Sequence, residues 1–251
     1  MDTHKLGVGK LDTELLKKLV FNNIKSVRDD ILVRPTVGED CAIVDYGENS
    51  LVISTDPITG TREEIGKLAV HINCNDIASN GIAPIGLMIT LMVPPGTSSK
   101  DIDYIMKQAG EEAQKLNVEI IGGHTEVTEA VNTIIISATA IGKIPTEKVM
   151  KKDKVKPGDK IVMTKSAGLE GTGIIAYEKE KALIDKLGER IVNEGKRLLD
   201  KVSVVREGII AGKMGISSLH DVTEGGLLGG IWELCEKEEL GCSIYEETIY
   251  I

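Results

Sequence analysis

The chain has few aromatic residues, few cysteines and no long apolar run. Aromatic residues make up 3% of its 251 residues, so a buried core must be built from aliphatic side chains and methionine. The four cysteines form no C-x-x-C pair, which argues against a disulfide framework and predicts a reducing, cytoplasmic setting. No stretch approaches about 18 uninterrupted apolar residues, and the first residues are too polar for a signal peptide. We therefore expect neither a membrane contact nor export.

Basic residues are outnumbered, with 30 Lys and Arg against 39 Asp and Glu, which gives a formal charge of −9. This balance argues against a surface that neutralises phosphates, so we expect no nucleic-acid partner. Hydrophobic residues at 41% and charged residues at 27% are typical of a globular protein. The length fits one large domain or two modest ones.

Helical and strand periods alternate along the chain and predict an α+β fold in two unequal parts. We expect strands over 41–44, 51–54, 85–93, 118–121, 133–141, 160–164 and 216–219. Helices are expected from Asp12 or Thr13, over 65–80, from Ser98 or Ser99, across most of 174–214 and over 226–237, with a glycine-rich loop at 168–173. The breaker-containing stretch 143–159, which includes Lys151 and Lys152, predicts a boundary between domains of residues 1–150 and 151–251. A long surface loop within one domain is the alternative.

Two acids lie at the ends of predicted strands. Asp40 opens the strand over 41–44, and Asp56 closes the strand over 51–54. Carboxylates presented by rigid strand ends suit a hard cation such as Mg²⁺, which prefers oxygen ligands. The alternative is that Gly-Glu-Asp and Asp-Pro are ordinary turn sequences.

The predicted helix over 65–80 carries a polar stripe. Asn73, Asp76 and Asn80 follow one another at spacings of three and four, which places them on one face. The other residues of this helix are largely small or apolar, so we expect the helix to be buried. A buried amide and carboxylate stripe needs a partner, which would be protein donors, a metal or a ligand.

The sequence Gly-Gly-His-Thr-Glu directly follows the predicted strand over 118–121. Gly122 and Gly123 predict a turn whose backbone N–H groups can face a phosphate. Thr125 and Glu126 would add a hydroxyl and a carboxylate. A simple glycine turn between two strands is the alternative.

His220 and Asp221 precede Thr-Glu-Gly-Gly at the start of the predicted helix over 226–237. Backbone donors at such a position bind anions, and Asp221 and Glu224 could bind a cation or accept a proton. Helix capping is the alternative. We take His220 and Asp221 as the candidate catalytic residues. The chain holds no Walker A, dinucleotide-binding, zinc or nucleophile-elbow motif.

Taken in order, these motifs resemble the aminoimidazole ribonucleotide (AIR) synthase superfamily, with its PurM-like fold, and most of all its HypE-like, AIR synthase-related branch. The resemblance rests on five segments, at 38–44, 54–57, 73–78, 122–126 and 220–226. It implies an N-terminal domain whose sheet pairs with a second copy into a barrel-like homodimer, followed by an α/β domain. Set against that family, the second domain would be incomplete at residue 251.

The resemblance also implies that ATP is held through divalent metals, in a cleft between the domains or across the dimer. Asp40, Asp56 and Asp76 match the carboxylates that hold metal and triphosphate, and Asp221 matches an acid near the acceptor. The residues implied to contact the nucleotide are Lys10, Asn73, Gly122, Gly123, Thr125 and Glu126. Bridging Mg²⁺ ions would offset the repulsion between a triphosphate and this acidic protein.

The implied activity is ATP-dependent phosphorylation of an amide or carbamoyl-type oxygen on a small-molecule or protein-borne acceptor, by positioning and electrostatics rather than by a protein nucleophile. Two alternatives are a small-metabolite kinase of the thiamine-monophosphate kinase type and a non-catalytic nucleotide-binding maturation scaffold. His124 stands where the kinase branch carries an aspartate. Cys235 and Cys242 come too early to match the C-terminal cysteine of the HypE branch proper.

Overall fold

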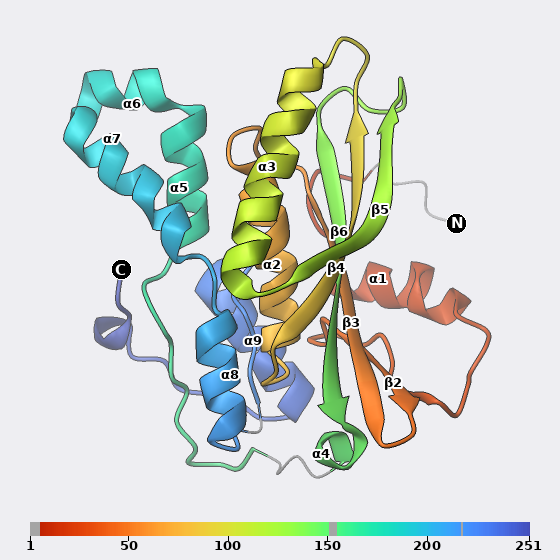
Figure 1. Ribbon diagram of the computed structural model, residues 1–251. Coiled ribbons are helices and arrows are strands. Elements are labelled where there is room, and N and C mark those ends of the chain that lie inside the picture. Colours follow the sequence, from red (N-terminus) through yellow and green to blue (C-terminus); the bar gives the residue numbers. More distant parts are fainter. Residues whose placement is uncertain (1–5, 151–154, 217) are drawn as a thin grey trace.

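A six-stranded mixed sheet forms the centre of the computed structural model, which describes residues 6–150, 155–216 and 218–251 (Figure 1). The strand order is β1-β2-β3-β6-β4-β5, and β4 pairs with β5 in parallel while the other pairs are antiparallel. This arrangement confirms the predicted α+β class. The strands are β1 (Ile31–Val33), β2 (Ala42–Tyr46), β3 (Asn49–Ile58), β4 (Pro84–Val93), β5 (Glu119–Val127) and β6 (Ile135–Pro145).

Two helices, α2 (Ile65–Ala78) and α3 (Ser99–Leu116), pack on one face of the sheet. Every residue of α2 is buried, because the helix lies between the sheet, α3 and a helix of the second part. The Ser98 hydroxyl accepts the Asp101 N–H at 3.2 Å and begins α3 as a capping box, as predicted. The sheet and these helices enclose the main hydrophobic core.

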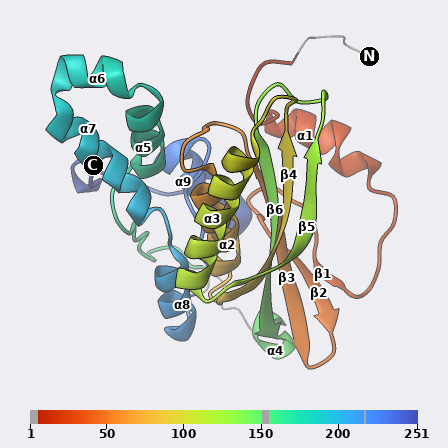
Figure 2. The ribbon, with the colours of Figure 1, turned by 45° about the horizontal axis from the view of Figure 1, so that its top comes forward.

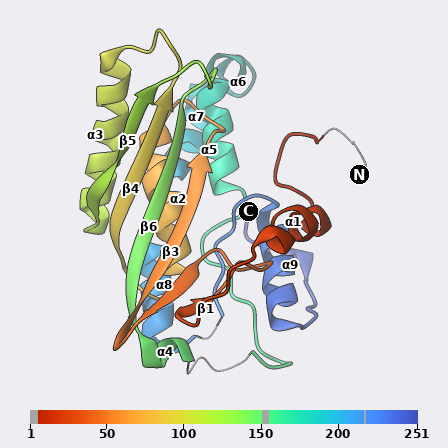
Figure 3. The same ribbon diagram turned by 90° about the vertical axis from the view of Figure 1, so that its right-hand side faces the viewer.

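Figure 3 looks onto the opposite face of the sheet, and the described helices lie behind or beside the strands in that view. Several apolar side chains on the strands at this side of the molecule are exposed, among them Ile85, Met88 and Ile121 at 47%, 50% and 50%. Helix α1 (Thr13–Leu19) is capped by Asp12, as predicted, but buries none of its residues.

The second part of the chain is helical where the structure describes it. Its helices are α5 (Leu169–Glu178), α6 (Glu180–Leu187), α7 (Glu189–Lys196), α8 (Val205–Lys213) and α9 (Gly226–Glu238). Short helices elsewhere in the described residues are α4 (Thr146–Met150) and the 3₁₀ helices Phe21–Asn23, Arg197–Lys201 and Glu246–Thr248. Helix α8 packs against α2, while α5, α6 and α7 form a separate group beside it (Figure 2). None of the helices in the described ranges is long and apolar enough to cross a membrane.

Two predicted strands of the second part are not formed. Residues 160–164 and the described residues of 216–219 have no strand pairing, and Ser217 lies outside the described residues. A β-rich sequence becomes a strand only when a neighbouring strand satisfies its backbone groups. The predicted loop at 168–173 is instead helical from Leu169. The division of the chain at residue 150 stays a prediction, and Lys151 and Lys152 lie outside the described residues.

Two strands of the sheet are longer than expected, which changes the position of predicted site residues. Asp56 does not close a strand but lies within β3, opposite Ala138 of β6. Gly122 and Gly123 form no turn, because β5 continues through both to Val127. Pairing with β4 keeps this segment extended, and a Cβ at Gly123 would lie 1.8 Å from the Ile89 carbonyl oxygen.

Candidate functional site

Asp76 of α2 and Ser54 of β3 form the buried floor of a carboxylate cluster. The Ser54 hydroxyl lies 2.6 Å from Asp76 Oδ2 and 2.9 Å from the Asp40 carbonyl oxygen. Burial, with Asp221, Asp56 and Asp40 nearby, raises the pKa of Asp76 to about 9, although the hydrogen bond with Ser54 opposes the change. A carboxyl held this way stays protonated at neutral pH unless a cation replaces the proton.

Asn73 connects α2 to the strand that carries Asp56. Its Oδ1 accepts the Asp56 N–H at 2.9 Å, and its Nδ2 donates to the Ala69 carbonyl at 2.9 Å. Burial and the carboxylates around it raise the pKa of Asp56 to about 6, while the positive charge of Lys10 opposes this. The polar stripe of the helix is thus partnered at Asn73 by protein backbone, and Asn73 fixes Asp56 beside the cluster.

Asp40 reaches the cluster from the loop that precedes β2. Gly38 of this loop has φ +77°, and a Cβ there would lie 2.8 Å from the Glu233 carbonyl oxygen of α9. Lys237 of α9 also makes an ion pair with Glu39, with Nζ 2.7 Å from Oε1. The loop is therefore held closely against α9, which sets the position of Asp40.

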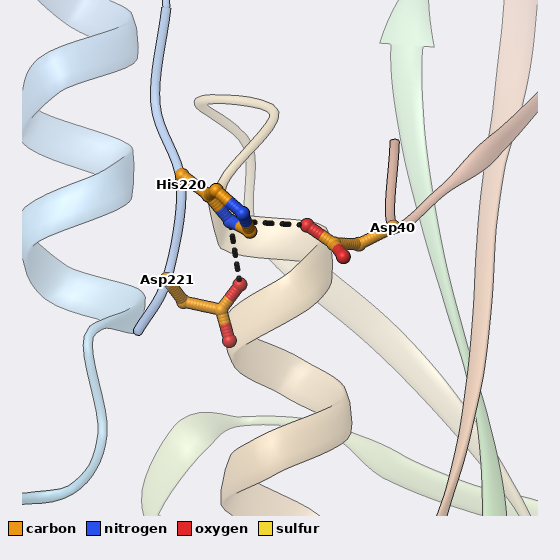
Figure 4. A group of neighbouring side chains, drawn as sticks. All are labelled: Asp40, His220 and Asp221. Atoms are coloured by element: carbon orange, nitrogen blue, oxygen red, sulfur yellow. Dashed lines mark ion pairs between the residues drawn. The ribbon is translucent and has the colours of Figure 1, made fainter. Parts of the chain in front are cut away.

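His220 lies beside the carboxylates of Asp40 and Asp221 (Figure 4), and Glu233 is a third carboxylate in contact with its ring. Its Nε2 is 2.8 Å from Glu233 Oε2, and its Nδ1 is 3.2 Å from Asp40 Oδ2 and 3.9 Å from Asp221 Oδ1. Burial lowers the pKa of His220, but the three acids outweigh it and raise that pKa to about 10. Without a bound cation, the imidazolium is the counter-ion of the cluster.

Asp221 is the most enclosed acid of this group after Asp76, with 6% of the residue exposed. Its Oδ2 is buried and makes no hydrogen bond within the described residues. Asp221 and Glu224 also contribute, after burial, to the raised pKa of Glu170 at the start of α5. The cluster thus extends from the sheet to the first turn of α5.

The structure brings together most of the predicted site residues. Asp40, Asp56, Asp76, His220 and Asp221 lie within one electrostatically linked cluster, with Asn73 behind it and the charge of Lys10 acting on it. Sequence reasoning named Glu224 beside Asp221 but missed three further residues: Ser54, Glu170 and Glu233. Ser54 was detectable, because it lies two residues before Asp56 and shares its side of the strand, whereas Glu233 is brought to His220 by the fold alone.

The segment 122–126, which contains Gly122 and Gly123, lies away from the acid cluster in the same chain. Asp56, Ala138, Ile89 and Gly123 are register partners in one row across β3, β6, β4 and β5. Three strand spacings separate Asp56 from Gly123, or about 14 Å. The predicted residues Gly122, Gly123, Thr125 and Glu126 are exposed on β5 and do not join the cluster within one chain.

The donor set of the cluster fits a hard divalent cation. Asp40, Asp56, Asp76 and Asp221 supply carboxylate oxygens, which Mg²⁺ prefers. The unpartnered, buried Asp221 Oδ2 is a further sign of a missing partner, because buried polar atoms are rarely left without one. These four residues could hold Mg²⁺ and, through it, the phosphates of a nucleotide.

A mixed sheet backed by helices on one face is the architecture of the PurM-like class of α+β proteins. Residues 38–144 match the family model for the AIR synthase related protein N-terminal domain, and residues 156–251 match that for its C-terminal domain. The chain belongs to the AIR synthase-related protein family.

Relatives and solved structures agree with this assignment. The chain is 30% identical to a candidate hydrogenase expression/formation protein of Methanocaldococcus jannaschii, over 97% of this chain and 72% of the relative. It is 29% identical to the carbamoyl dehydratase HypE of Bradyrhizobium diazoefficiens, over 84% of this chain and 61% of that protein. In fold, it matches a chain of a HypE–HypF complex with a TM-score of 0.72 at 21% identity, over 94% of this chain and 74% of that one.

Proposed function

We propose that the protein binds ATP with Mg²⁺ at the carboxylate cluster and phosphorylates an amide or carbamoyl-type oxygen. The observation that carries this proposal is the convergence of four acids from separate segments, two of them with a strongly raised pKa and one with an unpartnered buried oxygen. Such a cluster is costly without cations, so it indicates a site that is completed by them.

The position of each residue in or beside the cluster suggests its role in the proposed reaction. Asp40, Asp56 and Asp76 would hold Mg²⁺, Asn73 would keep Asp56 in place, and Lys10 would neutralise phosphate charge from outside the cluster. Asp221 would lie on the acceptor side, next to α5. Mg²⁺ would supply charge neutralisation for the transferred phosphoryl group, while the protein would orient the reactants and keep a base near the acceptor.

The names of the relatives support a carbamoyl-type acceptor and phosphoryl transfer separately. HypE proteins are called carbamoyl dehydratases, and a selenide, water dikinase of Cronobacter sakazakii is 26% identical over 98% of this chain. The chain spans 61% of two HypE relatives, so the activity of a whole protein is itself part of the proposal. The HypE–HypF complex supports a protein-borne acceptor, because that relative is seen with a protein partner.

A small-metabolite kinase is the second candidate. A thiamine-monophosphate kinase of Pyrococcus horikoshii is 28% identical over 85% of this chain, and AaThiL in complex with AMPPCP and TMP shares the fold with a TM-score of 0.60. Phosphorus NMR of the reaction mixture separates the two activities. Activation of an oxygen releases inorganic phosphate when the activated group reacts, whereas a kinase leaves the phosphate on its product.

We also propose that the active form is a homodimer that pairs two uncovered sheet faces. The exposed Ile85, Met88 and Ile121 suit such an interface. A second copy would also give a role to the exposed segment 122–126, which does not join the cluster within one chain. Sedimentation at micromolar concentration is expected to give a dimer, and a monomer would refute this proposal.

Calorimetry with Mg-ATP tests the nucleotide site. Asp76→Asn keeps the shape of the side chain but removes its ability to ionise when a cation binds, and it is expected to weaken Mg-ATP binding at least about 10-fold. Asp103→Asn on the exposed side of α3 is the matched control and should bind as the wild type does. Equal Mg-ATP affinity of wild type and a folded Asp76→Asn variant would remove the assigned site.

A further inference from the structure

We propose that Cys235 and Cys242 form a reversible redox pair, which closes to an intramolecular disulfide by exchange with a low-molecular-weight disulfide. Both residues are free thiols, Cys235 half-buried and Cys242 exposed, at the end of α9. No residue of the acid cluster takes part in this chemistry, so the proposal does not rest on the proposed function.

The turn that ends α9 brings the two cysteines together. Glu239 closes the helix in the left-handed conformation, with φ +54°. The chain then turns back, and the Leu240 N–H donates to the Cys235 carbonyl at 3.0 Å. Gly241 alone separates Leu240 from Cys242, so Cys242 lies beside the last turn of the helix that carries Cys235.

The two thiols interact with one another across this turn. Burial raises the pKa of Cys235, and the hydrogen bond between its thiol and that of Cys242 raises it further. A disulfide needs its two Cβ atoms about 3.5–4.5 Å apart. A Cβ added at Gly241 would meet nothing within 4 Å, so the segment that carries Cys242 has room to reach that geometry.

The surroundings of the two sulfur atoms give them different roles. Cys242 is exposed, so a dissolved disulfide can reach its sulfur. Cys235 is half-buried in the last turn of α9, where the negative end of the helix dipole and the raised pKa both disfavour its thiolate. Cys242 therefore attacks the oxidant first, and Cys235 closes the ring.

The exchange balances with a low-molecular-weight disulfide, RSSR, as the oxidant. The Cys242 thiolate attacks one sulfur of RSSR, which forms a mixed disulfide and releases one RS⁻. The Cys235 thiol loses its proton to solvent, and the resulting thiolate attacks the Cys242 sulfur and releases the second RS⁻. Two protein thiols are thereby oxidised to one disulfide, and RSSR is reduced to two thiols. In a reducing setting such a bond is typically transient or redox-sensing rather than structural.

The other two cysteines of the chain provide an internal control. Cys41 and Cys74 are 4% and 0% exposed. Burial raises the pKa of both thiols, that of Cys74 to about 12. Buried thiols of this kind are inert in a folded protein. A disulfide reagent should therefore distinguish the pair at the end of α9 from these two residues.

Dithiobis(nitrobenzoate), an aromatic disulfide, tests the pair in the folded, reduced protein. We expect the wild type to release two reagent thiolates for each reagent molecule consumed, to retain no reagent and to lose two hydrogens by mass. Cys235→Ser should release one thiolate and retain the reagent on Cys242. Cys242→Ser should react at least about 10-fold more slowly than the wild type, because its remaining thiol is half-buried. Ser243→Ala, which changes an exposed neighbour, is the control and should behave as the wild type does.

The proposal is overturned if the wild type releases no thiolate, if it retains the reagent on both cysteines, or if peptide mapping finds a disulfide that includes Cys41 or Cys74. Oxidation by glutathione disulfide, reversed by reduced glutathione, provides a second measurement without a variant. An intramolecular bond must form to an extent that does not change with protein concentration. An extent that rises with protein concentration would indicate a bond between two chains and would refute the pair.

Discussion

Replacing Asn75 with alanine would test whether one buried amide connects helix α2 to the second part of the chain. Asn75 Nδ2 donates to the Val202 carbonyl at 3.0 Å, and its Oδ1 accepts the Val204 N–H at 2.8 Å. Both partners lie in the segment that leads into α8, so the side chain fixes this segment against the core. Alanine would fit the space but would leave both backbone groups without their partner.

The expected loss follows from these two orphaned groups. A buried donor or acceptor that loses its partner costs about 1–3 kcal/mol. The Val202 carbonyl is on a buried residue, whereas Val204 is half-buried and water can reach it in part. We therefore expect Asn75→Ala to lower the free energy of unfolding by about 2–4 kcal/mol.

Urea unfolding measures this loss with two probes, far-ultraviolet circular dichroism for the whole chain and the fluorescence of Trp232, the single tryptophan, for α9. Asn80→Ala is the matched control, because Asn80 is half-buried and makes only a 3.3 Å bond within its own helix end. It should cost less than about 1 kcal/mol. A loss for Asn75→Ala no larger than that of the control would refute the role assigned to Asn75.

Two further predictions concern β5 and the contact between α2 and α3. Gly123→Ala should destabilise the protein by about 2–4 kcal/mol in urea unfolding, since the added Cβ would overlap the Ile89 backbone. Gly122→Ala is the control and should cost less than half as much, because a Cβ at Gly122 would meet only Met88 Cε, at 4.0 Å. In the pair His71–Glu112, burial lowers the pKa of His71, and contacts with Lys115 and His71 lower that of Glu112 against the effect of burial. Both groups bind more protons in the unfolded chain, so the contribution of this pair to stability should fall as pH drops below about 6.5 and further through the range where Glu112 titrates. The acids of the cluster, whose pKa values are raised, act in the opposite sense, so the measurement is the difference between wild type and His71→Gln. The stability of wild type relative to His71→Gln should fall as pH drops below about 6.5, and a difference in urea midpoint that does not change with pH would contradict this.

The elements of the first part could be predicted from sequence because their signals are local. The apolar run over 85–93 and the cap at Ser98 depend on neighbouring residues, and the structure confirms both. The strand predicted over 160–164 failed because its pairing depends on a partner distant in sequence. The predicted turn at Gly122–Gly123 failed for a related reason, since pairing with β4 outweighs the local tendency of two glycines to turn.

The candidate site was predictable only in part. Carboxylates at Asp40, Asp56 and Asp76 were recognisable from their motifs, but their grouping with His220 depends on how α9 packs against the loop at Gly38. Glu233 carries no signal of its own, because an acid on a helix is ordinarily a solvated residue. Its role follows only from the His220 contact, which no spacing in the sequence predicts.

The polar residues of α2 show how one buried helix can serve both stability and function. Asn73 and Asn75 make hydrogen bonds to backbone groups of β3 and of the segment before α8, so their amides already have partners within the protein. Asp76 lies on the same helix, but its neighbours are acids and a hydroxyl, and its charge finds no basic partner among the described residues that contact it. The amides therefore hold the helix rigidly in place, and the carboxylate that they position is the one that we propose to bind a cation.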